Sequence, residues 1–254
     1  MIRNLTKEKL LSGETVVGCF LKYAEADLAE YLALQGWDFL VFDGEHGTIE
    51  PGDLSGLARA CELHGVTPIA RVPTNLPHTI LRFLDTGIHG VHVPWVNSPG
   101  EAEAAVRSVK YHPRGVRGLA GNRSGDYGLT EPVDEFMARA NRETLTVIHI
   151  ETIAAVEAIE GYLEVDDLDV LFLGPTDLSQ SMGLAGRKGH PDLVAAMDRV
   201  AGAVAESDKI LGLYAATPED AAEWVGRGAR YVATGMEGFL RAGMAAYIDG
   251  VRRL

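Results

Sequence analysis

The chain has 254 residues, of which 46% are hydrophobic and 23% charged, and its formal net charge is −13. This composition excludes a disordered, collagen-like or coiled-coil protein. The negative charge argues against nucleic acid and anionic membranes as partners. Two cysteines, Cys19 and Cys61, are too few for a disulfide scaffold, and no run reaches the roughly 18 apolar residues of a membrane span. With no signal-like N-terminus, we predict a cytoplasmic protein.

Short apolar segments alternate with longer amphipathic ones along the whole chain. We predict strands over residues 16–21, 38–43, 67–72, 90–94, 145–151, 169–174, 210–214 and 231–234, several of which are almost wholly apolar, as parallel strands buried on both faces are. We predict helices over residues 24–35, 49–64, 76–86, 99–110, 153–161, 192–208, 218–228 and 238–253. Gly36, Gly65, Gly87 and Gly228 are expected as left-handed helix ends.

Eight β–α alternations in this length predict an α/β fold, a (β/α)8 TIM barrel, as one domain over residues 1–254. A doubly wound open sheet is the alternative, but it usually has fewer strands, and the sequence carries no nucleotide-binding fingerprint. Residues 111–142 interrupt the alternation with a Gly- and Arg-rich stretch followed by a helical pattern. A long insertion of this kind is more often functional or part of an interface than idle.

Charged and polar residues follow directly after several of the apolar strands. The catalytic end of such a barrel is the carboxyl end of its strands, so these residues are expected to share one pocket. They are Asp43, Glu45 and His46 after the second strand, Arg71 at the end of the third, Glu151 at the end of the fifth, and Gly174, Pro175, Thr176 and Asp177 after the sixth.

Glu151 and Asp177 lie one β–α unit apart, at the ends of strands about 4.8 Å from each other. Two carboxylates so placed repel each other unless a cation lies between them. Two protein carboxylates, with water and a chelating substrate, form a common Mg²⁺ or Mn²⁺ site. The alternative is that both residues only stabilise helix N-termini.

Arg71 and His46 are the other candidates for chemistry. An arginine at a strand end suits a carboxylate or an enolate oxygen, and the alternative is an ion pair with Asp43 or Glu45. A histidine beside carboxylates can move a proton near neutral pH, and either Asp43 or Asp85 is a candidate to orient the ring of His46. The alternative is a surface or capping histidine.

His149 precedes Glu151 by two residues, so both side chains point to the same side of the strand. It is a candidate metal ligand, a neighbour of the ligands, or a residue filling the barrel. We place no lysine at a strand end, assigning Lys110 and Lys209 to helix ends or loops. A Schiff-base aldolase, which needs a desolvated lysine in the barrel, is therefore disfavoured.

At these residues the sequence resembles the HpcH/HpaI family of metal-dependent (class II) pyruvate aldolases, which includes 4-hydroxy-2-oxoheptane-1,7-dioate and 2-keto-3-deoxy-sugar-acid aldolases. The motifs that carry the resemblance are WDFLVFDGEH, ARVP, LDTGIHGVHVPWVNSPGEAEAAV, YHPRGVRGL, HIET and LFLGPTDLSQSMG. Their joint order covers nearly the whole chain.

The resemblance implies a barrel of the phosphoenolpyruvate/pyruvate type and a lyase that cleaves a 4-hydroxy-2-oxo acid to pyruvate and an aldehyde. It implies that Glu151 and Asp177 hold a divalent metal (Mg, Mn or Co, with Zn possible) and that Arg71 contacts pyruvate. His46, with Asp43 or Asp85 beside it, would handle the proton. Backbone N–H groups around residues 174–177 would bind the pyruvate carboxylate. A homohexamer, a trimer of dimers that exchange their last helix (residues 238–254), is also implied.

Two features depart from the family pattern. The family usually has Gln where this chain has His149. The stretch GLAGNRSGDYG also differs from the sugar-acid enzymes, and this difference makes Arg123 and Tyr127 candidates for the aldehyde pocket or an interface. Three alternatives stay open: an oxaloacetate decarboxylase, a CoA-thioester lyase with the same metal site, and a catalytically silent metabolite-binding barrel.

Overall fold

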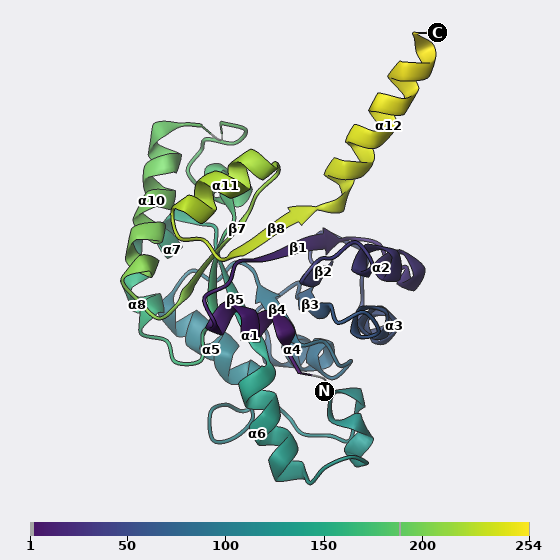
Figure 1. Cartoon of the computed structure of the whole chain (residues 1–254). Coiled ribbons are helices and arrows are strands. Elements are labelled where there is room, and N and C mark those ends of the chain that lie inside the picture. Colours follow the sequence, from purple (N-terminus) through teal and green to yellow (C-terminus); the bar gives the residue numbers. More distant parts are fainter. Residues whose placement is uncertain (1–2, 188, 254) are drawn as a thin grey trace.

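The protein is a closed barrel of eight parallel strands, seen in a computed structural model that describes residues 3–187 and 189–253 (Figure 1). The strands pair in chain order, and β1 pairs with β8 to close the barrel. Their bounds are β1 Val16–Leu21, β2 Phe39–Asp43, β3 Thr67–Arg71, β4 Gly90–Val93, β5 Leu145–Ile150, β6 Val170–Leu173, β7 Ile210–Tyr214 and β8 Tyr231–Gly235. The predicted (β/α)8 barrel is confirmed, and each strand lies within two residues of its predicted bounds.

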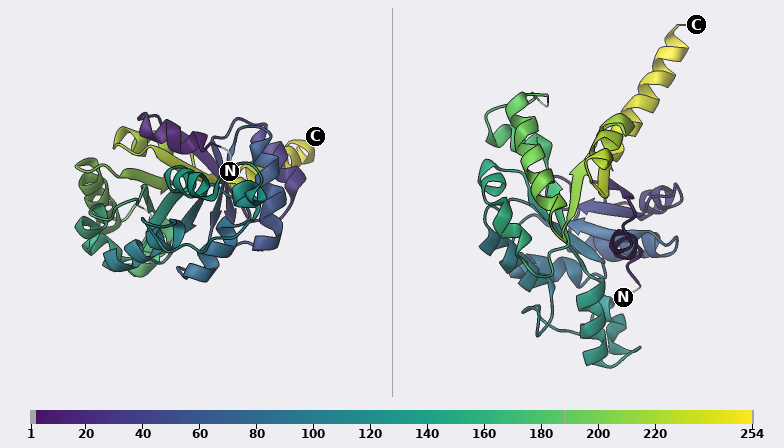
Figure 2. Two further views of the ribbon diagram at one scale, coloured as in Figure 1. Left: turned by 90° about the horizontal axis from the view of Figure 1, so that it is seen from below. Right: turned by 60° about the vertical axis from the view of Figure 1, so that its left-hand side comes forward.

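Helices follow the strands, and most of them lie around the outside of the barrel (Figure 2). They are α2 Ala26–Ala33, α3 Pro51–Glu62, α4 Pro77–Leu84, α5 Pro99–Val109, α7 Ile153–Glu157, α8 Ile159–Leu163, α9 Pro175–Ser181, α10 Pro191–Ala205, α11 Pro218–Gly226 and α12 Met236–Arg252. The single helix predicted over residues 153–161 is wrong, because the chain breaks at Ala158 into α7 and α8. All four glycines predicted as left-handed helix ends have positive φ angles.

Two apolar layers hold the barrel together. The outward-facing side chains of the strands pack against the helices in one large buried cluster, which includes Leu40, Ile148 and Leu171. The inward-facing side chains, such as Phe39 and Val147, form a second cluster inside the barrel. This double burial explains the nearly continuous apolar runs in the sequence, because alternate residues face two different apolar layers.

The amino ends of the strands are covered by helix α1 (Leu5–Leu11) and by the insertion. The α1 side chain of Leu10 packs into the barrel's inner cluster. The insertion contains the 3-10 helix η1 (Arg123–Gly128) and helix α6 (Val133–Glu143), which lie at the end of the molecule opposite to α12 (Figure 1). Helix α1 was not predicted, because its seven residues give too short an amphipathic pattern.

Helix α12 projects away from the barrel rather than lying along it (Figures 1 and 2). Apart from Met236, the described part of this helix has no buried residue. No helix among residues 3–187 and 189–253 combines the length and apolar character needed to cross a membrane. Both cysteines are free and buried, as predicted.

Candidate active site

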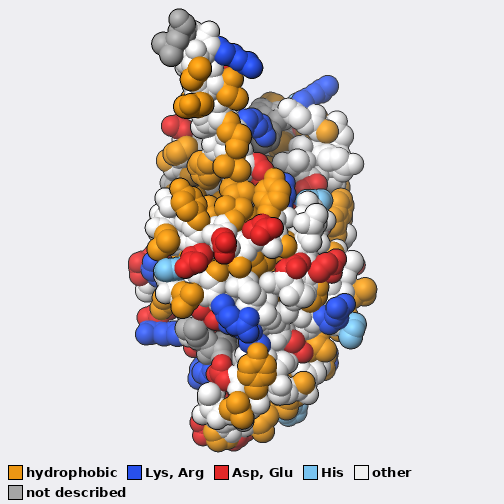
Figure 3. Space-filling model, turned by 90° about the vertical axis from the view of Figure 1, so that its right-hand side faces the viewer, with side chains coloured by type: hydrophobic (Ala, Val, Ile, Leu, Met, Phe, Trp, Pro, Cys, Tyr) orange, Lys and Arg blue, Asp and Glu red, His pale blue; other side chains and the backbone are white. Residues whose placement is uncertain are grey.

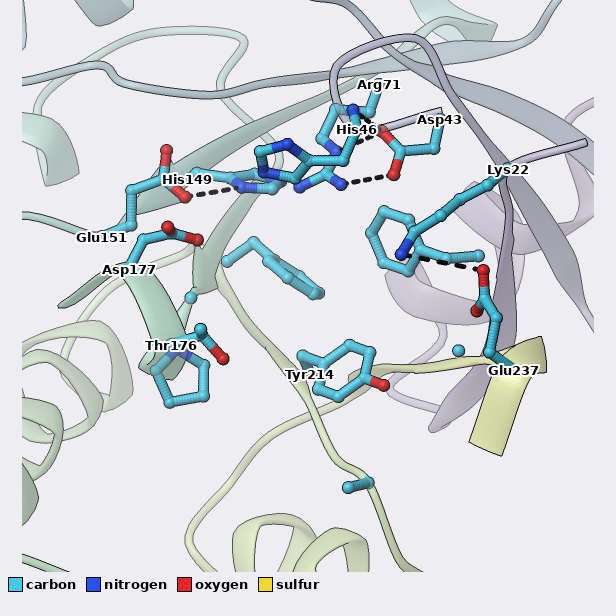
Figure 4. Close-up of a pocket in the computed structure, with 16 residues that line it drawn as sticks. Lys22, Asp43, His46, Arg71, His149, Glu151, Thr176, Asp177, Tyr214 and Glu237 are labelled. Carbon is cyan, nitrogen blue, oxygen red and sulfur yellow. Dashed lines mark hydrogen bonds and ion pairs between the residues drawn. The ribbon is translucent and has the colours of Figure 1, made fainter. Parts of the chain in front are cut away.

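A pocket of about 370 Å³ opens at the carboxyl ends of the strands (Figure 4). It is lined by all the predicted strand-end residues except Glu45, together with His149: Asp43, His46, Arg71, Glu151, Gly174, Pro175, Thr176 and Asp177. The rule that polar residues at strand ends converge in a barrel therefore located the pocket correctly.

Arg71 is held by two carboxylates. Its Nε and Nη2 donate to Asp43 Oδ1 and Oδ2 at 2.8 and 2.6 Å, and its Nη1 lies 3.2 Å from Glu45 Oε2. Burial raises the pKa of Asp43, but the hydrogen bonds and charge of Arg71, together with two backbone N–H groups, lower it overall. The ion pairs considered as an alternative role for Arg71 exist, and Arg71 lines the pocket as well. Its guanidinium is thus fixed and aimed by its partners.

The ring of His46 reaches into the pocket and is about half exposed. Asp43 does not orient this ring, contrary to one of the two expected arrangements, because its Oδ1 accepts the backbone N–H groups of Glu45 and His46 instead. The nearest carboxylate to the ring is Glu45, with Oε2 3.9 Å from His46 Nε2. Burial raises the pKa of Glu45 above its ordinary value.

Glu151 is almost fully buried, and both of its carboxylate oxygens accept a hydrogen bond. Trp95 N–H donates to Oε1 at 2.6 Å, and His149 Nδ1 lies 3.2 Å from Oε2. Burial raises the pKa of Glu151, but these two contacts lower it overall, so the carboxylate stays ionised. Trp95 holds a φ of 54°, a costly conformation for a bulky residue, which directs its N–H at Glu151.

Asp177 enters the pocket from the first turn of α9, on the same side as Glu151 (Figure 4). The backbone comes close here: a Cβ on Gly174 would lie 3.1 Å from Glu151 Oε2, so glycine leaves room for the carboxylate. The described residues contain no group of three or more His, Cys, Asp or Glu side chains placed as metal ligands. The two carboxylates fit a hard divalent cation whose other ligands come from water and substrate.

His149 lies inside the barrel with both ring nitrogens engaged. Its Nδ1 faces Glu151, and its Nε2 lies 2.9 Å from His92 Nδ1, whose own Nε2 lies 2.7 Å from the Tyr231 hydroxyl. Of the three roles considered for His149, this arrangement favours a neighbour of the metal ligands, because neither nitrogen is free to bind a cation.

The wall of the pocket opposite Glu151 and Asp177 is formed by Lys22, Tyr214 and Glu237 (Figure 4). Lys22 follows β1 directly, so the expectation that no lysine lies at a strand end is wrong. Its Nζ lies 3.7 Å from Glu237 Oε1, and its side chain is 42% exposed. A hydrated lysine beside a carboxylate lacks the desolvation that a Schiff-base lysine needs, so that class stays disfavoured.

The structure does not bring Asp85 or Arg123 to this pocket. Asp85 ends α4, and helix ends in this fold lie near the amino ends of the strands; its Oδ1 accepts from Arg117 Nη2 at 2.9 Å. Arg123 pairs with Glu62 and with the carbonyls of Thr86 and Gly87. Within one chain neither residue lines the pocket, and their proposed roles stay predictions.

Comparisons with known proteins agree with this geometry. The family model described as HpcH/HpaI aldolase/citrate lyase matches residues 16–242. The chain belongs to this family.

A 5-keto-4-deoxy-D-glucarate aldolase from Salmonella arizonae is 31% identical over 252 residues, covering 98% of this chain and 97% of that protein. A hydroxypyruvate/pyruvate aldolase from Sagittula stellata is 36% identical over 196 residues, covering 77% of this chain and 76% of that one. The solved HpcH/HpaI aldolase from Desulfitobacterium hafniense has a TM-score of 0.91 at 29% identity, covering 100% of this chain and 98% of that one. The predicted carbon–carbon lyase class is thereby confirmed.

Several residues of the pocket were not predicted from the sequence. Lys22 lines the pocket and directly follows β1, and Trp95, which donates to Glu151, comes two residues after β4. The same strand-end rule that found Arg71 could have found both. The partners of His149 carried no local signal, because His92 and Tyr231 are distant in sequence and meet only inside the closed barrel.

Proposed function

We propose that this protein is a metal-dependent aldolase that reversibly cleaves a 4-hydroxy-2-oxo acid into pyruvate and an aldehyde. The observation that carries the proposal is the pocket itself, in which Arg71 and the carboxylates of Glu151 and Asp177 face one cavity at the carboxyl end of the barrel. A cation site and a fixed guanidinium together suit a 2-oxo acid, which carries a carboxylate and a keto oxygen.

Glu151 and Asp177 would hold the divalent cation, Mg²⁺, Mn²⁺ or Co²⁺, with Zn²⁺ less suited to an all-oxygen site. When bound, such a cation supplies Lewis-acid stabilisation of negative charge on the substrate. The buried, ionised carboxylate of Glu151 supports this role, since an ionised group with two fixed donors is already oriented for a cation.

Arg71 would bind the carboxylate or the enolate oxygen of pyruvate. Its guanidinium is fixed by Asp43 and Glu45 before any substrate arrives, so no reorganisation is needed as negative charge develops. The backbone N–H groups of Thr176 and Asp177, in the first turn of α9, would assist at the carboxylate; Pro175 has no N–H to give.

His46 would move the proton, directly or through a water molecule. In the cleavage direction it removes the proton of the 4-hydroxyl, the bond between C3 and C4 breaks, and the electron pair passes into the pyruvate enolate. The protonated ring then returns the proton to C3 of the enolate, which completes the balance. Its half-exposed position fits a group that exchanges protons with solvent between turnovers.

The aldehyde half of the substrate would face Lys22, Tyr214 and Glu237. This wall offers an ammonium, a phenol and a carboxylate across the pocket from the metal side (Figure 4). Such a set of donors and acceptors suits hydroxyl groups better than an alkyl chain. We therefore propose a hydroxylated aldehyde as the preferred partner of pyruvate.

We further propose that α12 packs against another copy of this chain. Figure 3 shows apolar side chains along this projecting helix. The large exposed apolar residues of α12 are Phe239, Leu240, Met244, Tyr247, Ile248 and Val251. An exposed apolar patch of this kind marks an interaction surface. An exchange of this helix between the subunits of a hexamer would account for its projection and for its apolar composition. We propose that the enzyme has one domain and is cytoplasmic.

The proposed function is tested by pyruvate release from 4-hydroxy-2-oxo acids with wild type, Asp177→Ala and Asp192→Ala. Asp192 is an exposed carboxylate at the start of α10 and serves as the matched control. We expect Asp177→Ala to lose metal binding and nearly all activity, and Asp192→Ala to lose neither. Full activity and metal affinity in Asp177→Ala would refute the site, and release of CO₂ and pyruvate from oxaloacetate alone would favour decarboxylation.

A further inference from the structure

Four buried side chains form a continuous hydrogen-bonded chain from the metal side of the pocket into the barrel. Glu151 Oε2 lies 3.2 Å from His149 Nδ1, His149 Nε2 lies 2.9 Å from His92 Nδ1, and His92 Nε2 lies 2.7 Å from the Tyr231 hydroxyl. All four residues are at most 2% exposed. They come from β4, β5, β8 and the residue after β5, so the closed barrel is what assembles them.

With one proton on each imidazole ring, every hydrogen bond in this series has a definite direction. An ionised carboxylate only accepts, so His149 Nδ1 must carry the proton that it shares with Glu151. His149 Nε2 is then an acceptor, which places the single proton of His92 on Nδ1. His92 Nε2 in turn accepts from the Tyr231 hydroxyl. Burial lowers the pKa of His92 and raises the pKa of Tyr231, which favours the neutral form of both side chains.

Aromatic side chains pack against both imidazole rings and restrict their movement. Phe172 packs against His149 and His92 with ring centroids 5.0 and 5.1 Å apart, and Phe20 meets the edge of His92 at 5.5 Å. A donor is therefore held at one oxygen of Glu151, while Trp95 N–H holds the other. The remaining lone pairs of the carboxylate are left for a cation.

We propose that His149 is a positioning residue of the metal site, which His92 and Tyr231 hold as the Nδ1–H tautomer so that it donates to Glu151. The inference rests on the proposed role of Glu151 as a metal ligand. A glutamine at position 149 could do the same work, because its amide N–H₂ donates while its carbonyl accepts from His92.

The first test is metal affinity, measured by calorimetry with Mg²⁺ and Mn²⁺ in the absence of substrate. We expect His149→Met, which removes the donor but keeps the volume, to weaken binding by about 10- to 100-fold, as loss of a partner of a metal ligand does. His149→Gln should stay within about threefold of wild type. The matched control is His89→Met: His89 is equally buried and lies 3.2 Å from Glu62, at the other end of the barrel.

The second test reads the tautomers directly in the metal-free protein. In protein with ¹⁵N-labelled histidine, the signals lost in His149→Gln belong to His149, and those lost in His92→Phe belong to His92. Both rings should show a protonated Nδ1 and an unprotonated Nε2. A structural role alone would not require this pattern.

The outcomes separate the inference from the proposed function. Unchanged metal affinity in His149→Met, or a protonated Nε2 in His149, would overturn the inference while leaving the aldolase proposal in place. Loss of affinity in His149→Gln equal to that in His149→Met would also overturn it. A wild-type protein that binds no divalent cation would overturn the proposed function and the inference together.

Discussion

A single methyl group at position 174 should disturb the proposed metal site without disturbing the barrel. A Cβ on Gly174 would meet Glu151 Oε2 and Cβ at 3.1 Å, inside ordinary contact distance. Gly174 has a φ of −104° and a ψ of 81°, outside the left-handed region that favours glycine, so alanine adds no positive-φ strain. The Glu151 carboxylate must therefore move by a few tenths of an ångström, which is about the positional tolerance of a functional site. We expect Gly174→Ala to weaken metal binding about tenfold, or ~1.4 kcal/mol.

The assay is calorimetric titration of Gly174→Ala with Mn²⁺ beside a thermal unfolding curve. Gly202→Ala is the control, because a Cβ at Gly202 in α10 meets nothing within 4 Å. The control should bind Mn²⁺ as wild type does. Wild-type affinity in Gly174→Ala would show that Glu151 does not hold the cation, and a large fall in unfolding temperature would show that the contact strains the fold instead.

Three further changes have expected outcomes. Arg71→Lys keeps the charge but loses the two parallel guanidinium hydrogen bonds to Asp43. We expect kcat/KM for a 4-hydroxy-2-oxo acid to fall about 100-fold or more, and retained activity would contradict the role of Arg71. Lys22→Met should lower kcat/KM about tenfold for hydroxylated aldehydes but little for alkyl aldehydes in the synthesis direction, and equal losses would remove Lys22 from recognition. Burial raises the pKa of Glu62, yet hydrogen bonds from His89 and Arg123 lower it overall. Its folded pKa is thus below its unfolded one of about 4.3, so its contribution to stability is complete above the unfolded pKa and is lost as pH falls through the lower folded pKa. Glu62→Gln should therefore flatten the fall in unfolding temperature over that range, and an unchanged slope would argue against the effect.

The barrel was predictable because its signal is local and repeated. Each strand is a short apolar run, and each is followed by an amphipathic pattern and a glycine or proline. Helix α1, with seven residues, and the break between α7 and α8 were not predictable in this way. A one-residue interruption of a helix changes the apolar period too little to be seen in a single sequence.

The site was predictable as far as one rule reaches. Strand-end residues such as Arg71 and Glu151 converge because all eight parallel strands end on the same side. Asp85 lies away from this pocket within one chain because it ends a helix, and a helix that follows a strand runs back toward the opposite end of the barrel.

The hydrogen bonds that link His149, His92 and Tyr231 inside the barrel could not be predicted from the sequence. His92 and Tyr231 are 139 residues apart, and nothing in either segment names the other as a partner. Their meeting depends on which residues of β4 and β8 share a level inside the closed barrel. That register is a property of the assembled sheet, whereas the alternation of apolar residues is a property of each strand alone.

The most direct test of the central claim is pyruvate release from a panel of 4-hydroxy-2-oxo acids, measured with EDTA and again after Mg²⁺, Mn²⁺ or Co²⁺ is restored. The account predicts that release stops with EDTA and returns with the metal, with the fastest cleavage for substrates that yield a hydroxylated aldehyde. Release that continues undiminished in EDTA, or no release with any of the metals, would contradict it.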